Sequence, residues 1–283
     1  MTIMNKEKIW LVTGASQGLG LTLVKTLLTR GFRVAALSRS ADVLQKAMGT
    51  DGDNERFLPV QSRITDEDST RAAIEKVIHQ FGRIDVVVNN AGYGLGGSVE
   101  ELTDRETREN FEVNVFGTLN IIRKVMPYLR AQRSGHIFNI SSIAGFTSIN
   151  GAFSIYSATK FAICGMSEAL ATDVKPFGIK VTIVAPGAFR TNFLTPESLV
   201  LAQNPIGAYE HIRATHLQFQ QWNGQQPGDP EKAATAMIQM AGEAEPALYL
   251  FLGKDAYRRA TLKNEAVQSE LTKWEALITG TDF

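Results

Sequence analysis

Tyr156 and Lys160 are the two residues of this sequence whose types and spacing point most directly to proton chemistry. Residues four apart on a helix lie on the same face, one turn from each other, although such pairs are also common on solvent-exposed faces. A free phenol has a pKa near ~10, too high to exchange protons readily at neutral pH. An adjacent ammonium favours the phenolate and lowers that pKa. The pair could therefore act as a general acid that protonates a developing alkoxide.

A glycine-rich stretch near the start of the chain, TGASQGLG at 13–20, fits two motifs with unrelated chemistry. As G-x-S-x-G it would make Ser16 the nucleophile of a serine hydrolase, which also needs an oxyanion-hole amide from an earlier loop. Only thirteen residues precede Gly14, enough for one strand, and no histidine stands in a recognisable triad context. Three glycines at one strand-to-helix turn are costly unless something approaches the backbone. The sequence therefore favours a pyrophosphate cradle that includes Ser16.

The composition is that of an ordinary globular protein, with 283 residues of which 44% are hydrophobic and 20% charged. Lys plus Arg equals Asp plus Glu at 29 each, so no net charge draws the chain to nucleic acid or an acidic membrane. The single cysteine, Cys164, excludes an intramolecular disulfide, and we expect no metal site. MTIMNKEKIW has no signal-peptide pattern, and no apolar run reaches the ~18 residues of a membrane span. We expect a cytoplasmic location, with no membrane or nucleic-acid partner.

Short apolar runs alternate with longer amphipathic stretches along the chain. The runs are rich in Val, Ile, Leu and Phe, as strands covered on both faces should be. They predict strands at 8–13, 33–37, 56–61, 84–90, 135–141, 180–185 and 247–252. Helices are predicted at 19–30, 66–81, 103–130 and 154–177, the third opening with the capping-box pattern Thr103-x-x-Glu106. This order predicts an α/β fold with a doubly wound parallel sheet.

No Pro- or Ser-rich linker and no internal repeat divides the sequence. We therefore expect one domain over residues 1–283. Within it, a longer excursion occupies about 187–230 after the sixth strand, and a charged helical tail occupies about 253–280.

The further motifs resemble those of the short-chain dehydrogenase/reductase family over nearly the whole chain. The glycine turn has the TGxxxGxG spacing of single-domain members of that family. The remaining motifs follow in the family's order: Asn89-Asn90-Ala91-Gly92, Asn114, Ser142, Tyr156-x-x-x-Lys160, Pro186-Gly187 and Thr191. The resemblance implies a Rossmann fold of about seven strands, and an enzyme that interconverts a ketone or aldehyde and an alcohol by hydride transfer with a nicotinamide dinucleotide.

The resemblance also implies a role for each motif residue. Tyr156 would donate the proton, and Ser142 would hydrogen-bond the substrate oxygen, with Ser141 as a weaker candidate. Lys160 would also bond the nicotinamide ribose, and Asn114 would hold a water that links Lys160 to solvent. The residues expected to bind the cofactor are Gly14, Ser16, Gln17, Gly18, Leu19, Gly20, Ser38, Arg39, Arg63, Ile64, Asn90, Ala91, Gly92, Tyr156, Lys160, Pro186, Gly187 and Thr191.

The end of the second predicted strand bears on which dinucleotide is used. NAD-binding proteins place an acidic residue there to bond the ribose 2′-hydroxyl. Here Ser38 takes that position and Arg39 follows, and a guanidinium pairs well with a 2′-phosphate. The sequence favours NADP over NAD, although Arg39 could equally be a surface residue beside a helix that Ser40 caps.

Two features depart from the family pattern. Arg63 stands where the family usually has Asp beside the adenine, and it could stack on the base or add charge near the 2′-phosphate. Ser142 and Tyr156 are fourteen positions apart, one more than usual, and we place the extra residue in the 147–153 loop.

The excursion at 187–230 is strongly apolar. Its large apolar residues are Phe189, Phe193, Leu194, Leu199, Leu201, Tyr209, Ile212, Leu217, Phe219 and Trp222, and Ile143, Phe146 and Phe153 are expected on the opposite rim. By resemblance this excursion is a substrate lid, and the stretch PGAFRTNF resembles the hydroxysteroid-dehydrogenase-like subgroup. A hydrophobic carbonyl substrate follows, unless these side chains are core or dimer contacts.

Three alternatives remain open. An oxoacyl-carrier-protein reductase would share the motif residues but need a basic docking patch, for which Arg123, Lys124, Arg130 and Arg133 are candidates. A non-catalytic NADP-binding regulator would not need Tyr156, Lys160, Ser142 and Asn114 together. A hydrolase would depend on Ser16.

By resemblance, the helices at 103–130 and 154–177 would form a homodimer interface, and two dimers could join as a homotetramer.

Overall fold

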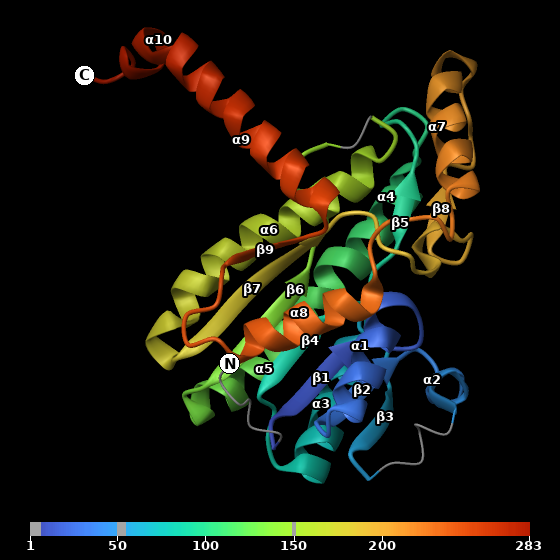
Figure 1. The fold of residues 1–283 in the computed structure, drawn as a ribbon, viewed down its shortest axis with the longest axis vertical. Helices are drawn as coiled ribbons and strands as arrows, with labels where there is room; N and C mark the ends of the chain where they lie inside the picture. Colours follow the sequence, from blue (N-terminus) through green and yellow to red (C-terminus); the bar gives the residue numbers. More distant parts are fainter. Residues whose placement is uncertain (1–6, 50–54, 149–150) are drawn as a thin grey trace.

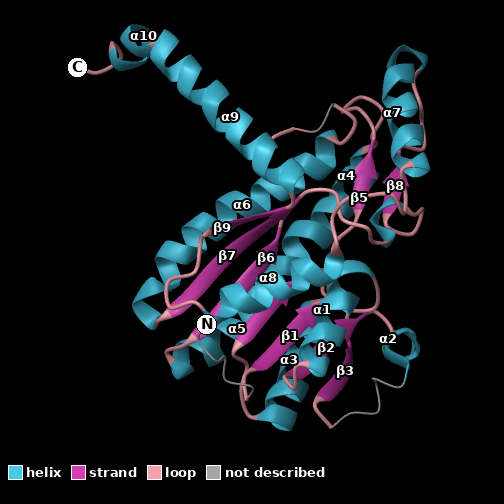
Figure 2. Ribbon diagram, viewed as in Figure 1, coloured by secondary structure: helices cyan, strands magenta, loops and turns pink. Residues whose placement is uncertain are grey.

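A seven-stranded parallel sheet forms the centre of the computed structural model, which describes residues 7–49, 55–148 and 151–283. The strand order is β3-β2-β1-β4-β6-β7-β9, and each neighbouring pair is parallel (Figures 1 and 2). All seven predicted strands are confirmed. Their bounds are β1 Ile9–Thr13, β2 Arg33–Ser38, β3 Phe57–Gln61, β4 Val86–Asn89, β6 Gly135–Ile140, β7 Ile179–Pro186 and β9 Tyr249–Leu252.

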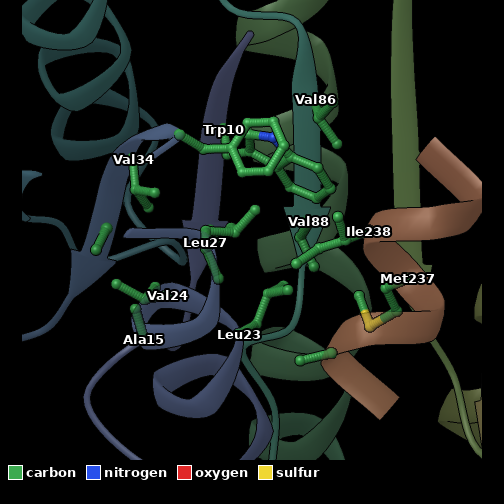
Figure 3. Close-up of a cluster of buried hydrophobic side chains, with 14 of the residues drawn as sticks. Trp10, Ala15, Leu23, Val24, Leu27, Val34, Val86, Val88, Met237 and Ile238 are labelled. Atoms are coloured by element: carbon green, nitrogen blue, oxygen red, sulfur yellow. The ribbon is translucent and has the colours of Figure 1, made fainter. Parts of the chain in front are cut away.

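Helices cover both faces of this sheet. On one face lie α1 Gly18–Thr29, α2 Ala41–Met48 and α8 Pro230–Gly242; on the other lie α3 Glu67–Phe81, α5 Gly117–Gln132 and α6 Ser154–Val174. Each face therefore has its own hydrophobic core. Figure 3 shows the first, in which Trp10 of β1, Leu23 and Leu27 of α1, and Met237 and Ile238 of α8 are buried together. Burying one such side chain stabilises the fold by about 1.5–3 kcal/mol.

The predicted helix at 103–130 is interrupted in the structure. It consists of α4 Asp104–Phe111, a π-helical turn Glu112–Phe116 and then α5. The predicted capping box is confirmed, because Glu106 N donates to Thr103 Oγ1 and Thr103 N donates to Glu106 Oε2. Periodicity alone could not show the π turn, which carries the buried Asn114.

A small second sheet was not predicted. It pairs β5 Gly94–Gly96, just after β4, with β8 Leu199–Leu201 of the apolar excursion, in parallel. The excursion also contains α7 Glu210–Gln221, and we call residues 187–230 the lid. These strands have three residues each, too short to show an alternating pattern.

The carboxyl ends of the central strands carry most of the predicted motifs. From β1 the chain first adds strands toward one edge of the sheet, β2 and β3, and from β4 onward it adds them toward the other edge. The loops after β1 and β4 therefore leave the sheet in opposite directions. In open α/β sheets, ligands bind at such a switch point. The glycine turn follows β1 and Asn90-Ala91-Gly92 follows β4, which places both at the expected crevice.

The predicted tail is helical, comprising α9 Lys254–Lys273 and α10 Glu275–Thr279, and it projects away from the rest of the molecule (Figure 1). Among the described residues, no helix is long and apolar enough to cross a membrane. The first six residues, part of the stretch in which we expect no signal peptide, lie outside the described part of the chain, as do residues 149–150 of the loop expected to hold the extra residue.

His136 is a buried titratable residue on β6. Its Nε2 lies 2.9 Å from Thr182 Oγ1, which itself donates to the carbonyl of Ala247. Nε2 is therefore the protonated nitrogen, and the buried Nδ1 has no partner among the described residues. Protonation of Nδ1 would create an unpaired buried charge, and burial, aided by Lys180 and Lys8, lowers the pKa of His136 to about 3.

This histidine should make the fold sensitive to acid. Between pH 6.5 and about 3 the unfolded chain binds a proton at this ring that the folded protein does not, so stability falls as the pH is lowered, by at most about 1.4 kcal/mol per pH unit. In His136→Gln this loss should shrink, whereas the exposed His79→Gln should behave as wild type. Urea unfolding at pH 7.5 and pH 5 measures the difference, and an equal acid sensitivity of wild type and His136→Gln would contradict the argument.

Candidate active site

The glycine turn between β1 and α1 has a backbone conformation that only glycine adopts readily, and it leaves its amides without side-chain cover. Gly14 and Gly18 have φ of +62° and +56°, which side chains disfavour, and a Cβ on Gly14 would lie 2.7 Å from Ala91 Cα. Gln17 precedes α1 without capping it, and no acidic residue lies in its first turn. The amides and positive end of this helix are thus available to an anion, which fits a dinucleotide pyrophosphate. Ser16, Leu19 and Gly20 belong to this turn.

Asn90 holds the ends of β1 and β4 together. Its Nδ2 donates to the carbonyls of Thr13 and Gly14 at 2.9 and 3.0 Å, and its own amide and that of Ala91 donate to Thr13 Oγ1. The structure thus shows Asn90 bracing the glycine turn. Gly92, next along the chain, is exposed beside the turn.

Tyr156 and Lys160 lie in the first two turns of α6, as predicted, and both are buried. Lys160 Nζ lies 5.8 Å from the centre of the Tyr156 ring and donates to the carbonyl of Ile140, at the end of β6, at 2.8 Å. Ser141 Oγ lies 3.0 Å from the Lys160 carbonyl, to which it donates. These bonds fix the start of α6 at the carboxyl end of the sheet.

Burial dominates the acid–base properties of this pair. It raises the pKa of Tyr156 to about 12, opposed by a hydrogen bond with Ser142, and it lowers the pKa of Lys160 to about 8. Burial therefore sets the phenol pKa of the chain by itself, and the lowering of that pKa by the Lys160 ammonium stays a prediction. A buried amine that titrates near neutrality remains suited to proton exchange.

Ser142 and Ser141 point to different partners. Ser142 contacts Tyr156 and accepts from the amide of Ala144, starting the short helix Ile143–Gly145. Ser141 is buried behind it, and its hydroxyl also lies 3.2 Å from Cys164 Sγ. The geometry therefore favours Ser142 over Ser141 for contact with a substrate oxygen.

Asn114 sits at the π turn, buried against the loop that follows β4. Its Oδ1 accepts from the amide of Tyr93, and its Nδ2 donates to the Tyr93 carbonyl and to Thr159 Oγ1 of α6. A Cβ on Gly92 would meet Asn114 Oδ1 at 2.9 Å and Lys160 Nζ at 3.6 Å, so the two side chains flank Gly92. The π turn brings the amide to this position, as such turns frequently do at functional sites.

The residues predicted around the adenosine end lie after β2 and β3. Ser38 is buried at the end of β2, Arg39 is exposed beside it, and Ser40 caps α2 by accepting from the amide of Val43. Arg63 is exposed after β3, and Ile64 is half-buried against α5. All of these positions lie at the carboxyl edge of the sheet, on the same side as the glycine turn.

The loop after β7 is held by the start of the C-terminal helix. Asp255 accepts from the amide of Ala188 at 2.8 Å, and a Cβ on Gly187 would collide with its carboxylate. Thr191 lies close to Gly18 and caps the short helix Asn192–Leu194. Pro186, the last residue of β7, begins this loop. We did not identify Asp255 from the sequence, because a single acid in a charged tail carries no local signal.

Two buried carboxylates anchor the lid, a role that was predicted for neither. Glu101 accepts from the amides of Ser98 and Ile206 and pairs with Arg213, while Glu106 accepts from the amide of Gln203. Burial alone would raise the pKa of each carboxyl, but these hydrogen bonds hold it below its usual value. The sequence did contain a signal for Glu101, because Ser98-x-x-Glu101 has the same spacing as the capping box Thr103-x-x-Glu106. In the structure the amide of Glu101 donates to Ser98 Oγ, as that pattern predicts.

The lid also contacts the glycine turn and β5. Gln17 Nε2 donates to Ser198 Oγ of the lid at 2.9 Å. A Cβ on Gly94 would lie 2.9 Å from the ring of Phe193 and one on Gly96 2.7 Å from His216, so these glycines let the lid approach. The glycine-rich stretch GYGLGG at 92–97 was a signal in the sequence for this close approach, and it was not interpreted there.

The large apolar side chains named from the sequence are found in four places. Most of the predicted lid residues pack with Tyr156 and Phe153, and the ring centres of Phe193 and Phe153 lie 5.7 and 6.3 Å from that of Tyr156. The members are Phe193, Leu194, Leu199, Leu201, Tyr209, Ile212 and Phe219. The expected positions of three others were wrong: Ile143 and Phe146 pack against α9, and Phe189 joins the first core. Leu217 and Trp222 are exposed.

Comparison with known proteins gives a consistent picture. A family model described as short chain dehydrogenase matches residues 8–199. The chain is 37% identical to a 3-ketodihydrosphingosine reductase of Bacteroides thetaiotaomicron, covering 85% of this chain and 86% of that protein. It is 39% identical to a short-chain dehydrogenase of Streptomyces avermitilis of known structure, covering 98% and 99% of the two chains with a TM-score of 0.89. A Burkholderia phymatum structure in complex with NAD shares the fold at 22% identity and a TM-score of 0.82, covering 94% and 97%.

Proposed function

Since this chain belongs to the short-chain dehydrogenase/reductase family and is an oxidoreductase of that family, we propose that it interconverts a hydrophobic ketone or aldehyde and its alcohol with NADP(H). The observation that carries the proposal is the burial of Tyr156 and Lys160 together at the switch-point end of the sheet, with Ser142 in contact with the phenol. A bound nicotinamide dinucleotide would supply the hydride.

The side chains of the site would supply the proton and hold the reacting oxygen. Tyr156 remains protonated at neutral pH, as a general acid must, and would donate its proton to the carbonyl oxygen, while the hydride goes to the carbonyl carbon. Ser142 donates a second hydrogen bond to the same oxygen. Lys160 accepts or releases a proton near pH 8 and so can restore the phenol. Asn114, which like Lys160 lies beside Gly92, would hold the water that links this amine to solvent.

The dinucleotide would lie along the carboxyl edge of the sheet. Its pyrophosphate would meet the glycine turn, and the 2′-position of its adenosine ribose would lie near Ser38 and Arg39. A carboxylate at the end of β2 would repel a 2′-phosphate, whereas the exposed Arg39 can pair with it. This charge pattern supports NADP over NAD, and Arg63 offers a second cation at the same edge.

The walls above the catalytic pair support an apolar substrate. Phe153 and Phe193 pack on the Tyr156 ring, and Leu199 and Ile212 of the lid are buried in the same cluster. Apolar walls with few polar groups select apolar ligands. The related Bacteroides protein is named for reduction of a keto group, which agrees with this direction of chemistry.

A carrier-protein substrate is less well supported. Three of the basic residues considered for docking lie on α5 and Arg133 caps its C-terminus. This helix begins beside Asn114 and runs to the opposite edge of the sheet, where β6 starts. Lys124 is paired with Glu67 at 2.7 Å, and Arg133 donates to the carbonyl of Pro176. A purely regulatory role would leave the burial and contacts of the Tyr156–Lys160 pair unexplained.

Removing the phenol hydroxyl tests the proposal. Tyr156→Phe should lower kcat for reduction of an apolar aryl ketone by about 10²–10⁴-fold, because the proton donor is lost while the ring packing remains. NADPH binding, measured by fluorescence titration, should persist. Tyr128→Phe, at a half-buried tyrosine of α5 that packs on the second core, is the matched control. Unchanged turnover in Tyr156→Phe would refute the proposed role.

Cofactor preference is tested separately by steady-state kinetics with the two dinucleotides. We expect the wild-type KM for NADPH to be at least about tenfold below the KM for NADH. Arg39→Ala should raise the KM for NADPH by about tenfold and leave the KM for NADH unchanged, because one charge-assisted pair with the 2′-phosphate is lost. Arg33→Ala, at the exposed amino end of β2, is the control. A wild-type preference for NADH would overturn the assignment of Ser38 and Arg39.

A further inference from the structure

The lid helix α7 is fastened to the body of the molecule by buried polar side chains. Glu101 accepts from the amide of Ile206, just before α7, at 3.0 Å and pairs with Arg213 of α7 at 3.3 Å. From the same helix, His216 Nε2 donates to the carbonyl of Ala152, in the loop before α6, at 2.8 Å. Because α7 is held by both the loop after β5 and the loop before α6, it presents one fixed face to the start of α6.

That face of α7 is largely apolar. Ile212, His216 and Phe219 follow one another at spacings of four and three residues, which places them on one side of the helix. Ile212 and His216 are buried, and Ile212 and Phe219 belong to the same cluster as Tyr156. His216 already uses its Nε2 on a backbone carbonyl. The side of α7 toward the catalytic phenol therefore offers a ligand mainly apolar contacts.

Aromatic rings connect the catalytic phenol to the surface of the lid. The ring centre of Phe153 lies 6.3 Å from that of Tyr156, and the ring centre of Phe219 lies 5.4 Å from that of Phe153, both in edge-to-face contact. Trp222, at the end of α7, lies 6.5 Å from Phe219 and is 36% exposed. We call these four residues the aromatic row. The row begins at the reactive group and ends in solvent.

The side chains around the aromatic row are aliphatic. The larger ones in this cluster are Leu102, Ile155, Leu194, Leu199, Leu201 and Ile212. The two buried carboxylates that anchor the lid, Glu101 and Glu106, accept from its backbone amides and so are already partnered. A polar ligand group placed here would leave water without gaining a hydrogen bond, which is costly.

We propose that the substrate carries a long unbranched alkyl chain, which extends from a carbonyl at Tyr156 along the aromatic row to Trp222. This inference rests on the function proposed above and adds the shape of the substrate to it. An alkyl chain in this place exchanges ring–ring contacts for ring–methylene contacts, and each methylene that lies along the row leaves water. Methylenes beyond Trp222 return to solvent and gain nothing.

The first test is a series of straight-chain aldehydes from hexanal to tetradecanal, reduced with the dinucleotide that the enzyme prefers and kept below their solubility limits. kcat/KM should rise about three- to fourfold with each added methylene, and level off once the chain reaches Trp222. Turnover of hexanal with an equal kcat/KM for decanal would overturn the long site and leave the proposed function standing. Failure to reduce any aldehyde or aryl ketone would overturn both.

The second test removes the exposed end of the aromatic row. Trp222→Ala should lower kcat/KM for tetradecanal relative to hexanal by about tenfold, because the last methylenes lose their wall. Leu217→Ala, at a 58% exposed leucine on the opposite side of α7, is the matched control and should leave this ratio unchanged. A wild-type ratio in Trp222→Ala, or the same loss in Leu217→Ala, would contradict the proposal.

Phe219→Leu separates a substrate contact from simple core packing, since it keeps an apolar side chain in the middle of the row. As part of the substrate wall, the variant should show a smaller gain in kcat/KM per methylene for the chains that reach it, with a Tm close to wild type. A lower Tm with the wild-type dependence on chain length would assign Phe219 to the core and overturn the route along the row.

Discussion

The packing of the start of α6 on the carboxyl end of β6 is the constraint from which the rest of the site follows. Lys160 donates to the carbonyl of Ile140 across this contact, and Ser141 donates back to the carbonyl of Lys160. Together these bonds place a buried phenol and a buried amine one helical turn apart at the edge where the strands end. A buried amine in an apolar core would be costly without such a partner, so the hydrogen bond to Ile140 both permits the burial and fixes the position.

The remaining elements complete this edge. The π turn after α4 delivers Asn114 to the Tyr93 backbone and to Thr159 of α6, so the helix is held from a second side. Asp255 of α9 holds the loop after β7. Glu101 and Glu106 fasten the lid through its backbone amides. Each is a polar side chain that satisfies main-chain groups at a loop, which is how irregular segments can be buried near a reactive centre.

Much of this could be predicted from the sequence, because periodicity and turn residues act locally. Continuous apolar runs predicted all seven central strands, and Thr103-x-x-Glu106 predicted the capping box. The β5–β8 pairing could not be predicted, since it joins segments distant in the chain, and the π turn leaves no mark in the apolar periodicity of its helix. The burial of the phenol, which raises the pKa of Tyr156, could not be predicted for the same kind of reason: spacing revealed the neighbouring amine, but only the fold reveals how completely the phenol is removed from water. Likewise, the apolar character of Ile143 and Phe146 was evident, but their packing on α9 was not.

The most direct test of the account is the pH dependence of kcat for NADPH-dependent ketone reduction in wild type and Lys160→Met. If Tyr156 is the proton donor and Lys160 tunes it, wild-type kcat should fall as the pH rises through one ionisation. In Lys160→Met the same ionisation should move to higher pH, with a lower plateau, because the phenol loses its cationic neighbour. An ionisation that stays at the same pH in Lys160→Met would contradict the coupling of these two side chains.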